Sequence, residues 1–343
     1  MSKKVALIGF GGTIAMVPNA AGALEPATSA DDLVKYAPGL RKLGAELDVI
    51  DLLNKDSSNL TPKDWMLLIN KIYELQSKYD GIIVTHGTDT MAYTATATSL
   101  AFGPKLTLPI IFTGSQLPII DPGTDADVNL ERSMQAMIEA INRNICEVMI
   151  VFADSVLRAS RTIKVSEARF DAFDSPAFPH LADITATDIV FSPLAKKGKK
   201  GPKLTAKPQN TFANGIVSID VRPGLEPKLV AAITKSDESS SLILKSLGAG
   251  NVPSEKEYSL LPVIKDIVRA GKPVIIATKF IGGRTIPGLY EPGRAAIEAG
   301  AGHAGNMTDV AAEVKLMWLM GQGIRDPKKV NQAMLKSFVG EID

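Results

Sequence analysis

The sequence predicts an α/β protein built on parallel sheets. From Lys4 to about Asp183, short continuous apolar runs alternate with helical patterns, as expected for strands buried on both faces. After a change of composition, a shorter series of the same kind follows. The chain has 343 residues, 45% of them hydrophobic, which is enough for roughly two domains. We therefore expect an N-terminal α/β domain over residues 1–190, a linker over 191–213 and a smaller α/β domain over 214–343.

Five apolar runs are the expected strands of the first domain. They are Val5 to Phe10, Leu47 to Leu52, Gly81 to Thr85, Leu108 to Thr113 and Val148 to Phe152. Helical patterns lie between them, including one from Thr61 to Ser77. There, Thr61 suits the N-cap position and Pro62 suits the first helical position.

The second domain follows a basic, Pro/Gly-containing run over residues 194–208 that lacks periodicity. A solvated connector explains this run better than a binding patch, because the net charge is only +1. Residues 215–221, 241–247 and 274–278 are the expected strands. In the last expected helix, Asn306 and Asp309 resemble a capping box. Val310, Val314, Met317, Trp318 and Gly321 follow the spacing of a buried stripe.

Composition excludes several classes of function. The 38 basic and 37 acidic residues create no field that would attract nucleic acid or an anionic membrane. The single cysteine, Cys146, excludes an intramolecular disulfide, and three scattered histidines (His86, His180, His303) disfavour a metal site. No apolar stretch approaches the ~20 residues of a membrane span, and no signal-peptide pattern is present. We expect a soluble cytoplasmic protein that takes a small molecule and uses no metal in its chemistry.

A hydroxyl follows the first expected strand. The run Val5 to Phe10 leads into Gly11-Gly12-Thr13, which places Thr13 at the exit of a glycine turn. A helix N-cap is an equally good explanation of Thr13. A dinucleotide site is disfavoured because Ile14 occupies the position of the third small residue. The free N–H groups of the two glycines suit an anion such as a substrate carboxylate.

A similar arrangement follows the third expected strand. His86-Gly87-Thr88-Asp89-Thr90 places two hydroxyls around a carboxylate, which is more than the capping of a helix over Met91 to Leu100 requires. Parallel strands can bring their carboxyl ends together, and ligands bind there. A hydroxyl nucleophile must also lose its proton to a base. The sequence therefore predicts one site to which both turns contribute side chains.

The segment Arg158 to Lys164 offers a base, since it follows the strand over residues 148–152 and could return its charges to the same end of the sheet. Burial and neighbouring cations can lower the pKa of a lysine so that it acts as a base near neutral pH. A solvated surface charge is an equally weighted alternative. Residues 56–59 and 248–253 are further candidate substrate contacts, although both also suit ordinary turns.

Together these motifs resemble the bacterial-type L-asparaginase family, which includes glutaminase-asparaginases, and look most like its cytoplasmic type I members. The motifs are GGTIA at 11–15, DSSN at 56–59, HGTDTM at 86–91, RTIK at 161–164, DAFDSP at 171–176 and GAGNVP at 248–253. The resemblance covers essentially the whole chain. It implies a Rossmann-like N-terminal domain, a flavodoxin-like C-terminal domain, homotetramers built from intimate dimers, and no cofactor.

The resemblance also implies roles for residues. Thr13 matches the nucleophile that receives the β-aspartyl group, and Thr88, Asp89 and Lys164 match a second catalytic set in which Asp89 also binds the α-amino group. Asn251 matches a residue that reaches into the neighbouring subunit's site, and Glu291 the neighbour's acidic partner. The full set of expected substrate contacts is Gly12, Ser57, Ser58, Gly87, Ser115, Asn251 and Glu291.

Two departures from the family pattern stand out. Family members usually carry a tyrosine on the flexible loop after the GGTIA motif, but residues 16–25 contain none. We therefore expect that loop to close as a lid held by apolar contact through Leu24. Ser115 stands where alanine is common, so we expect an extra hydroxyl in the pocket wall.

The expected activity is hydrolysis of L-asparagine to L-aspartate and ammonia, with the preference over glutamine open. One alternative is the ammonia-generating subunit of a tRNA-dependent amidotransferase. It is disfavoured because the first strand begins at residue 4, without the usual N-terminal extension, and because no basic surface is evident. A non-catalytic amino-acid sensor is the other alternative.

Overall fold

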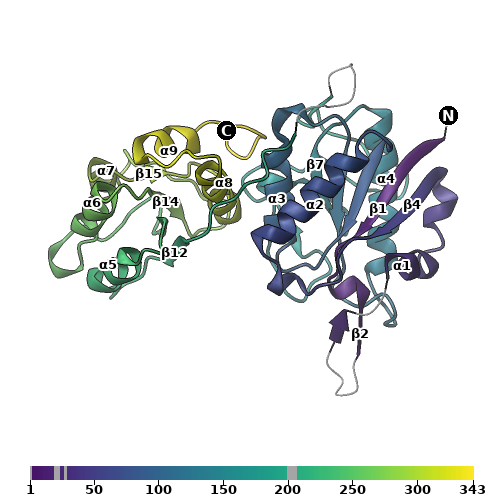
Figure 1. Cartoon of the computed structure of the whole chain (residues 1–343), viewed down its shortest axis with the longest axis horizontal. Coiled ribbons are helices and arrows are strands. Elements are labelled where there is room, and N and C mark those ends of the chain that lie inside the picture. The colour runs from purple at the N-terminus through teal and green to yellow at the C-terminus, as the bar shows by residue number, and fades with distance from the viewer. Residues whose placement is uncertain (1, 19–23, 27–28, 199–206) are drawn as a thin grey trace. The chain divides into compact units, whose positions relative to one another are not determined.

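The chain forms two compact units, Met1–Asn210 and Thr211–Asp343 (Figure 1). The computed structural model describes residues 2–18, 24–26, 29–198 and 207–343. Each unit contains its own sheet and its own apolar core. The predicted α/β class, with a large parallel sheet and a smaller second α/β domain, is confirmed.

The sheet of the first unit has seven strands in the order β11-β8-β7-β6-β5-β1-β4. Five are parallel: β1 (Lys3–Gly9), β4 (Ala45–Asp51), β5 (Gly81–Thr85), β6 (Ile110–Thr113) and β7 (Val148–Phe152). All five were predicted. β5, β6 and β7 are buried on both faces, as is most of β1, whereas β4 alternates between half-buried and exposed residues. Two antiparallel strands, β8 (Ser155–Arg158) and β11 (Ala182–Asp183), complete the edge and were not predicted.

The strand order places a topological switch point between β1 and β5. The chain leaves β1 toward β4 on one side, whereas it leaves β5 toward β6 on the other. The carboxyl ends of β1 and β5 therefore flank the crevice where ligands bind in open α/β sheets. Both hydroxyl-bearing turns of the sequence lie at this point.

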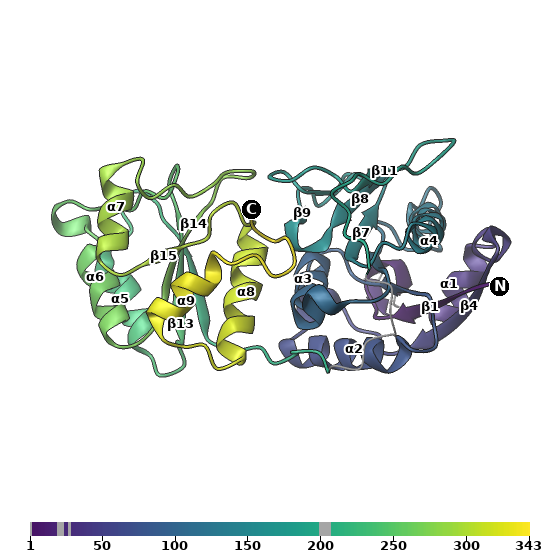
Figure 2. The same ribbon diagram turned by 90° about the horizontal axis from the view of Figure 1, so that it is seen from above.

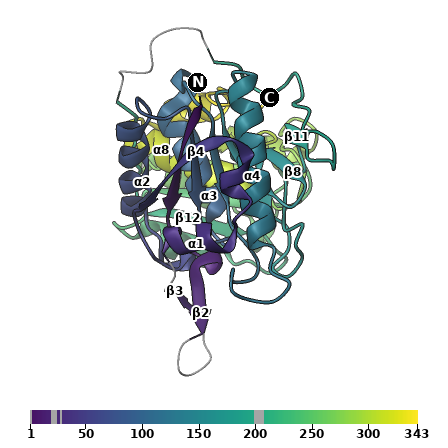
Figure 3. The same cartoon turned by 90° about the vertical axis from the view of Figure 1, so that its right-hand side faces the viewer.

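Helices cover both faces of this sheet (Figure 3). On one face, α1 (Ala30–Tyr36) and α4 (Ala126–Asn142) share a core cluster with alternate residues of β1. On the other, α2 (Pro62–Leu75) packs beside α3 (Met91–Phe102). The predicted cap of α2 is confirmed, because Thr61 and Asp64 form a capping box.

Short strand pairs and 3-10 turns lie in the segments between the main elements. β2 (Met16–Pro18) pairs with β3 (Leu24–Pro26), and β9 (Ile163–Lys164) pairs with β10 (Phe173–Asp174). The side chain of Leu24, expected to hold a lid, lies outside the described residues. The 3-10 turns are η1 (Thr13–Ala15), η2 (Leu40–Leu43), η3 (Ser57–Asn59), η4 (Gly103–Lys105), η5 (Ala159–Arg161) and η6 (Lys256–Tyr258).

The start of the expected linker is part of the first unit. Ala195 is buried in the core cluster of that unit. The N–H of Cys146 donates to the Lys196 carbonyl at 2.8 Å, and Lys197 forms a β-bridge with Ile145. The first part of the predicted linker is therefore packed rather than exposed, and residues 199–206 of it lie outside the described residues.

The second unit has four parallel strands in chain order: β12 (Ile216–Asp220), β13 (Ser241–Ser246), β14 (Val274–Thr278) and β15 (Gly302–His303). The connecting helices α5 (Pro227–Lys235), α6 (Leu261–Arg269) and α7 (Glu291–Glu298) pack in a row (Figure 2). The last two helices, α8 (Asp309–Gly321) and α9 (Pro327–Met334), pack together.

The predicted cap of α8 is wrong. Its N-cap is Thr308, whose hydroxyl accepts from the Ala311 N–H at 3.0 Å. Asn306 instead donates to the Asp343 carboxylate at 2.6 Å. Of the predicted stripe, Val310, Val314 and Trp318 are buried, whereas Met317 and Gly321 are half-buried.

A buried ion pair fixes the C-terminal segment. Lys315 on α8 lies 2.7 Å from the Glu341 carboxylate, and both side chains are 0% exposed. Lys315 Nζ also donates to the carbonyls of Met334 and Lys336, both at 2.8 Å. The pair lowers the pKa of Glu341 against the desolvation that would raise it.

We expect Lys315→Met to lower the free energy of unfolding by ~3–5 kcal/mol, because it leaves the Glu341 carboxylate buried without its cation. The double variant Lys315→Met/Glu341→Leu should recover part of this loss, because it removes the unpaired charge but still leaves the carbonyls of Met334 and Lys336 and the Phe338 and Val339 N–H groups without these partners. Urea unfolding of both variants measures the difference. A double variant no more stable than the single one would contradict the account.

Candidate active site

The site begins where two glycine turns touch. Gly12 has φ +93°, and a Cβ built there would lie 2.1 Å from the Gly87 main-chain nitrogen. Only glycine permits both this conformation and this approach. Because Thr13 and Thr88 each follow the contact by one residue, the turns bring both hydroxyl-bearing residues to the same end of the sheet.

Thr13 is the first residue of η1, whose N-cap is Gly12. The alternative in which Thr13 serves as the cap is therefore wrong. Ile14 and Ala15 are buried and anchor the turn, while Thr13 remains partly exposed. Its hydroxyl has no hydrogen-bond partner among the described residues, so it is free to meet a ligand.

Thr88, Asp89 and Lys164 form one cluster. Lys164 Nζ donates to Thr88 Oγ1 at 2.8 Å and to Asp89 Oδ1 at 2.7 Å. Thr88 is buried, whereas the Asp89 side chain is 65% exposed. Asp89 does not cap α3, whose N-cap is Thr90. Asp89 is instead held in an ion pair with one face open to a ligand.

Lys164 is the one cation of the Arg158–Lys164 segment that reaches this cluster. Arg158 lies opposite Met149 in the β7–β8 pairing and forms a buried ion pair with Glu147. The guanidinium of Arg161 lies over the Phe178 ring. The expectation that the whole segment returns its charges to the carboxyl end was wrong for Arg158, because β8 runs antiparallel to β7 and places this residue opposite Met149. Arg161 follows in η5, where it is buried.

The loop after β4 contributes Ser57 and Ser58 in different ways. Ser57 is buried against the second turn, and a Cβ at Gly87 would lie 2.5 Å from its hydroxyl oxygen. Thr90 Oγ1 donates to the Ser57 carbonyl at 2.8 Å. Ser58 is exposed, and its N–H and hydroxyl both donate to Asp56 Oδ1, at 2.7 and 2.6 Å. The structure therefore brings Ser57 directly to the turns, while Asp56 orders Ser58.

Ser115 follows β6 and adjoins the same turns through its neighbour, since a Cβ at Gly114 would lie 2.3 Å from the His86 carbonyl oxygen. Ser115 is fully buried, and its hydroxyl donates to the Leu117 carbonyl at 2.5 Å. The expectation of an extra hydroxyl in the pocket wall is therefore wrong, because the Ser115 hydroxyl is already hydrogen-bonded within a local turn. The Ser115 N–H has no partner among the described residues.

Asn251 and Glu291 both belong to the second unit. Asn251 closes a tight turn with Leu247 through two main-chain hydrogen bonds, at 2.8 and 3.1 Å. Glu291 begins α7 and forms an ion pair with Arg294. A Cβ at Gly293 would lie 3.6 Å from Asn251 Oδ1, so the start of α7 adjoins this turn.

His86, for which the sequence predicts no role, is fully buried beside the second turn. Its ring lies 5.6 Å from that of Phe10 and 6.1 Å from that of Phe112. Nδ1 lies 2.7 Å from the Gly87 carbonyl oxygen, and Nε2 lies 2.9 Å from Thr94 Oγ1. Burial lowers the pKa of His86 to about 4, so the ring is neutral at neutral pH. Its place directly before Gly87 is the one sequence signal of this contact.

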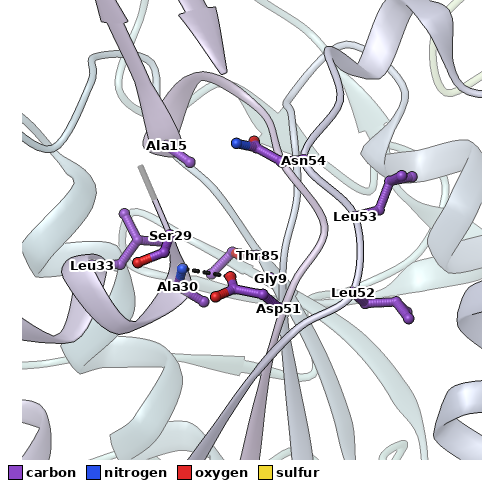
Figure 4. Close-up of a pocket in the computed structure, with 11 residues that line it drawn as sticks. Gly9, Ala15, Ser29, Ala30, Leu33, Asp51, Leu52, Leu53, Asn54 and Thr85 are labelled. Atoms are coloured by element: carbon purple, nitrogen blue, oxygen red, sulfur yellow. Dashed lines mark hydrogen bonds between the residues drawn. The ribbon is translucent and has the colours of Figure 1, made fainter. Parts of the chain in front are cut away.

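A cavity of about 280 Å³ lies on the other side of the first turn (Figure 4). Its lining includes Gly11, Asn54 and Thr85 but not Thr13, Thr88 or Lys164. Asp51 Oδ1 accepts from the Ala30 N–H at 2.7 Å inside it, which ties the start of α1 to the end of β4. The cavity therefore borders the site without containing its reactive groups.

Comparison with known proteins agrees with this architecture. Residues 4–195 match the family model "Asparaginase, N-terminal", and residues 216–334 match "Glutaminase/Asparaginase C-terminal domain". An L-asparaginase of Thermococcus kodakarensis is 32% identical over 340 residues, covering 99% of both chains. A glutamyl-tRNA(Gln) amidotransferase subunit of Aeropyrum pernix is 31% identical over 356 residues, covering 99% of this chain and 79% of its own.

Solved structures give the same result. The thermostable L-asparaginase from Thermococcus kodakarensis superposes with a TM-score of 0.88 at 32% identity, covering 99% of each chain. L-asparaginase I from Vibrio cholerae superposes with a TM-score of 0.87 at 30% identity, covering 100% of each. Fold and matches together define an amidohydrolase. The chain belongs to the asparaginase family.

Proposed function

We propose that this chain is an L-asparaginase that hydrolyses the side-chain amide of L-asparagine through an ester on Thr13. The contact between the two glycine turns carries this proposal, because it sets a free hydroxyl beside the Thr88–Asp89–Lys164 cluster. A nucleophile and a hydrogen-bonded proton-transfer group in one crevice are what acyl transfer requires.

The reaction proceeds in two displacements. Thr13 Oγ1 attacks the amide carbon of asparagine, and its proton passes through the Thr88–Lys164 cluster to the leaving nitrogen, which departs as ammonia. Water then attacks the resulting β-aspartyl ester, the C–O bond to Thr13 breaks, and the threonine hydroxyl recovers a proton. Aspartate leaves. Each half-reaction is a proton-coupled acyl transfer that needs no metal or redox partner.

The negative charge that develops on the amide oxygen needs donors already in place. The N–H groups of Thr88 and Ser115 lie at neighbouring strand ends and have no partner among the described residues. We assign them as the oxyanion donors. Each such donor contributes about 3 kcal/mol where one has been removed in other enzymes.

Substrate recognition uses the remaining groups. The open face of the Asp89 carboxylate suits the α-ammonium of the substrate, and Ser57, Ser58, Gly12 and Gly87 line the approach for its α-carboxylate. Asn251 and Glu291 are proposed to act from a neighbouring subunit, which makes a homo-oligomer, a tetramer of paired dimers, part of the proposal. Light scattering of the purified chain tests that state.

The Aeropyrum pernix relative favours a second candidate, the ammonia-supplying subunit of an amidotransferase. The two functions differ in what the chain does alone. We expect the purified chain to release ammonia from free L-asparagine, with saturation over a concentration series, and to act on L-glutamine more slowly. Ammonia release only when an amidotransferase partner and charged tRNA are added would establish the second candidate.

Calorimetric binding of asparagine without formation of any product would instead indicate a non-catalytic amino-acid sensor.

We propose a cytoplasmic location, which fractionation of the source cells can test. The structure adds one finding on membranes: over the residues it describes, no helix is both long and apolar enough to span a bilayer.

A further inference from the structure

We propose that His86 is a positioning residue that aims the Thr88 N–H at the reacting carbonyl oxygen by holding the Gly87 carbonyl from behind. The inference rests on the proposed function for the identity of the reaction. Its support comes from contacts of His86 that lie outside the reactive cluster.

The hydrogen bonds of His86 fix its tautomer. The Gly87 carbonyl can only accept, so Nδ1 carries the ring proton and donates to it at 2.7 Å. The neutral ring then accepts at Nε2 from the Thr94 hydroxyl, 2.9 Å away on α3. Burial supports this state by lowering the pKa of His86 to about 4. The ring therefore presents a permanent donor to the second turn.

Holding the Gly87 carbonyl also fixes the Thr88 N–H. The two groups belong to one trans peptide plane, in which the carbonyl and the N–H point in opposite directions. With the carbonyl turned toward His86, the N–H of Thr88 faces away from the ring. Thr88 is buried, and its N–H has no hydrogen-bond partner in the part of the chain that the structure describes. An unpaired buried donor is costly unless a ligand uses it.

Glycine at position 87 makes this restraint necessary. A glycine peptide can rotate between several backbone states at low cost. Gly12 and Ser57 crowd the turn from one side, and His86 secures the other. The ring itself is held between the Phe10 and Phe112 side chains, so it cannot follow a rotating carbonyl. Preorganised donors of this kind act mainly on the transition state.

The test uses substitutions that keep one nitrogen at a time. In His86→Asn the amide nitrogen stands near Nδ1 and can still donate to the Gly87 carbonyl, whereas in His86→Gln it stands near Nε2 and cannot. We expect His86→Asn to keep kcat for L-asparagine within about tenfold of the parent. His86→Gln and His86→Phe should lose about 100-fold or more in kcat, the effect of removing one oxyanion donor, with KM changed less than about threefold.

Thr98→Val is the matched control. Thr98 is buried on α3 and donates to the Thr94 carbonyl at 2.8 Å, so its loss removes a buried hydrogen bond without touching the Gly87–Thr88 peptide. The thermal unfolding midpoint of Thr98→Val should fall while its kcat stays unchanged. Equal losses of kcat in His86→Asn and His86→Gln, with Thr98→Val active, would overturn the proposal, as would full activity of His86→Phe.

A second measurement needs no variant. In a crystal structure of the parent chain with L-aspartate bound, the Thr88 N–H should lie about 3 Å from an oxygen of the product's side-chain carboxylate. A rotated Gly87–Thr88 peptide in that complex would refute the role of His86 even if asparaginase activity stands. A parent chain with no activity on L-asparagine would refute the proposed function instead, whatever the orientation of this peptide.

Discussion

Replacing Thr13 by alanine should lower kcat for L-asparagine by at least about three orders of magnitude, because loss of a covalent step removes ~4 kcal/mol or more of transition-state stabilisation. The fold should survive, since Thr13 is partly exposed and its hydroxyl has no partner among the described residues. Steady-state ammonia release measures the loss, and thermal unfolding checks the fold.

Thr13→Ser is the matched control, since it keeps the hydroxyl and removes one methyl group. It should retain far more activity than Thr13→Ala. Isothermal titration with L-aspartate should show product affinity preserved in both variants. Turnover of Thr13→Ala within about tenfold of the parent would exclude Thr13 as the nucleophile.

Replacing Lys164 by methionine should lower kcat by about 100-fold or more while KM changes only a few-fold, because the ammonium serves proton transfer rather than binding. Methionine keeps much of the length of the side chain but removes the hydrogen bonds to Thr88 and Asp89. Initial rates over a substrate series separate the two constants.

Lys71→Met is a suitable control, since Lys71 also forms an ion pair, with Glu74 at 3.5 Å on the surface of α2. It should leave both constants unchanged. If Lys164→Met instead raised KM strongly at constant kcat, Lys164 would be a binding residue, and the proton path proposed above would need another carrier.

The first sheet could be predicted from sequence because β1, β5, β6 and β7 are largely buried on both faces and their sequences are nearly unbroken apolar runs, while β4 alternates apolar and acidic residues. The same signal locates the two turns, since glycines and hydroxyls end the runs at Gly12 and Gly87. Alternation of strands and helices then implies that the ends of β1 and β5 meet, which the structure shows in the contact between these glycines.

Other features depend on long-range pairing that no local pattern encodes. The reversal of β8 places Arg158 opposite Met149 and away from the site, and nothing in the Arg158–Lys164 segment itself signals that turn. The Ser115 hydroxyl is taken by a carbonyl two residues later. Helix α9 was missed because its sequence is mostly polar, with only Val330 and Met334 buried. The hydrogen bond between His86 and the Gly87 carbonyl could not be predicted, because it depends on the fold burying the His86 ring.

The most direct test of the account is mass spectrometry of the enzyme quenched with acid during turnover of L-asparagine. The account predicts a peptide that contains Thr13 and carries the added mass of one β-aspartyl group, and the absence of this peptide from Thr13→Ala. An aspartyl group on a peptide containing Thr88, with Thr13 unmodified, would contradict it.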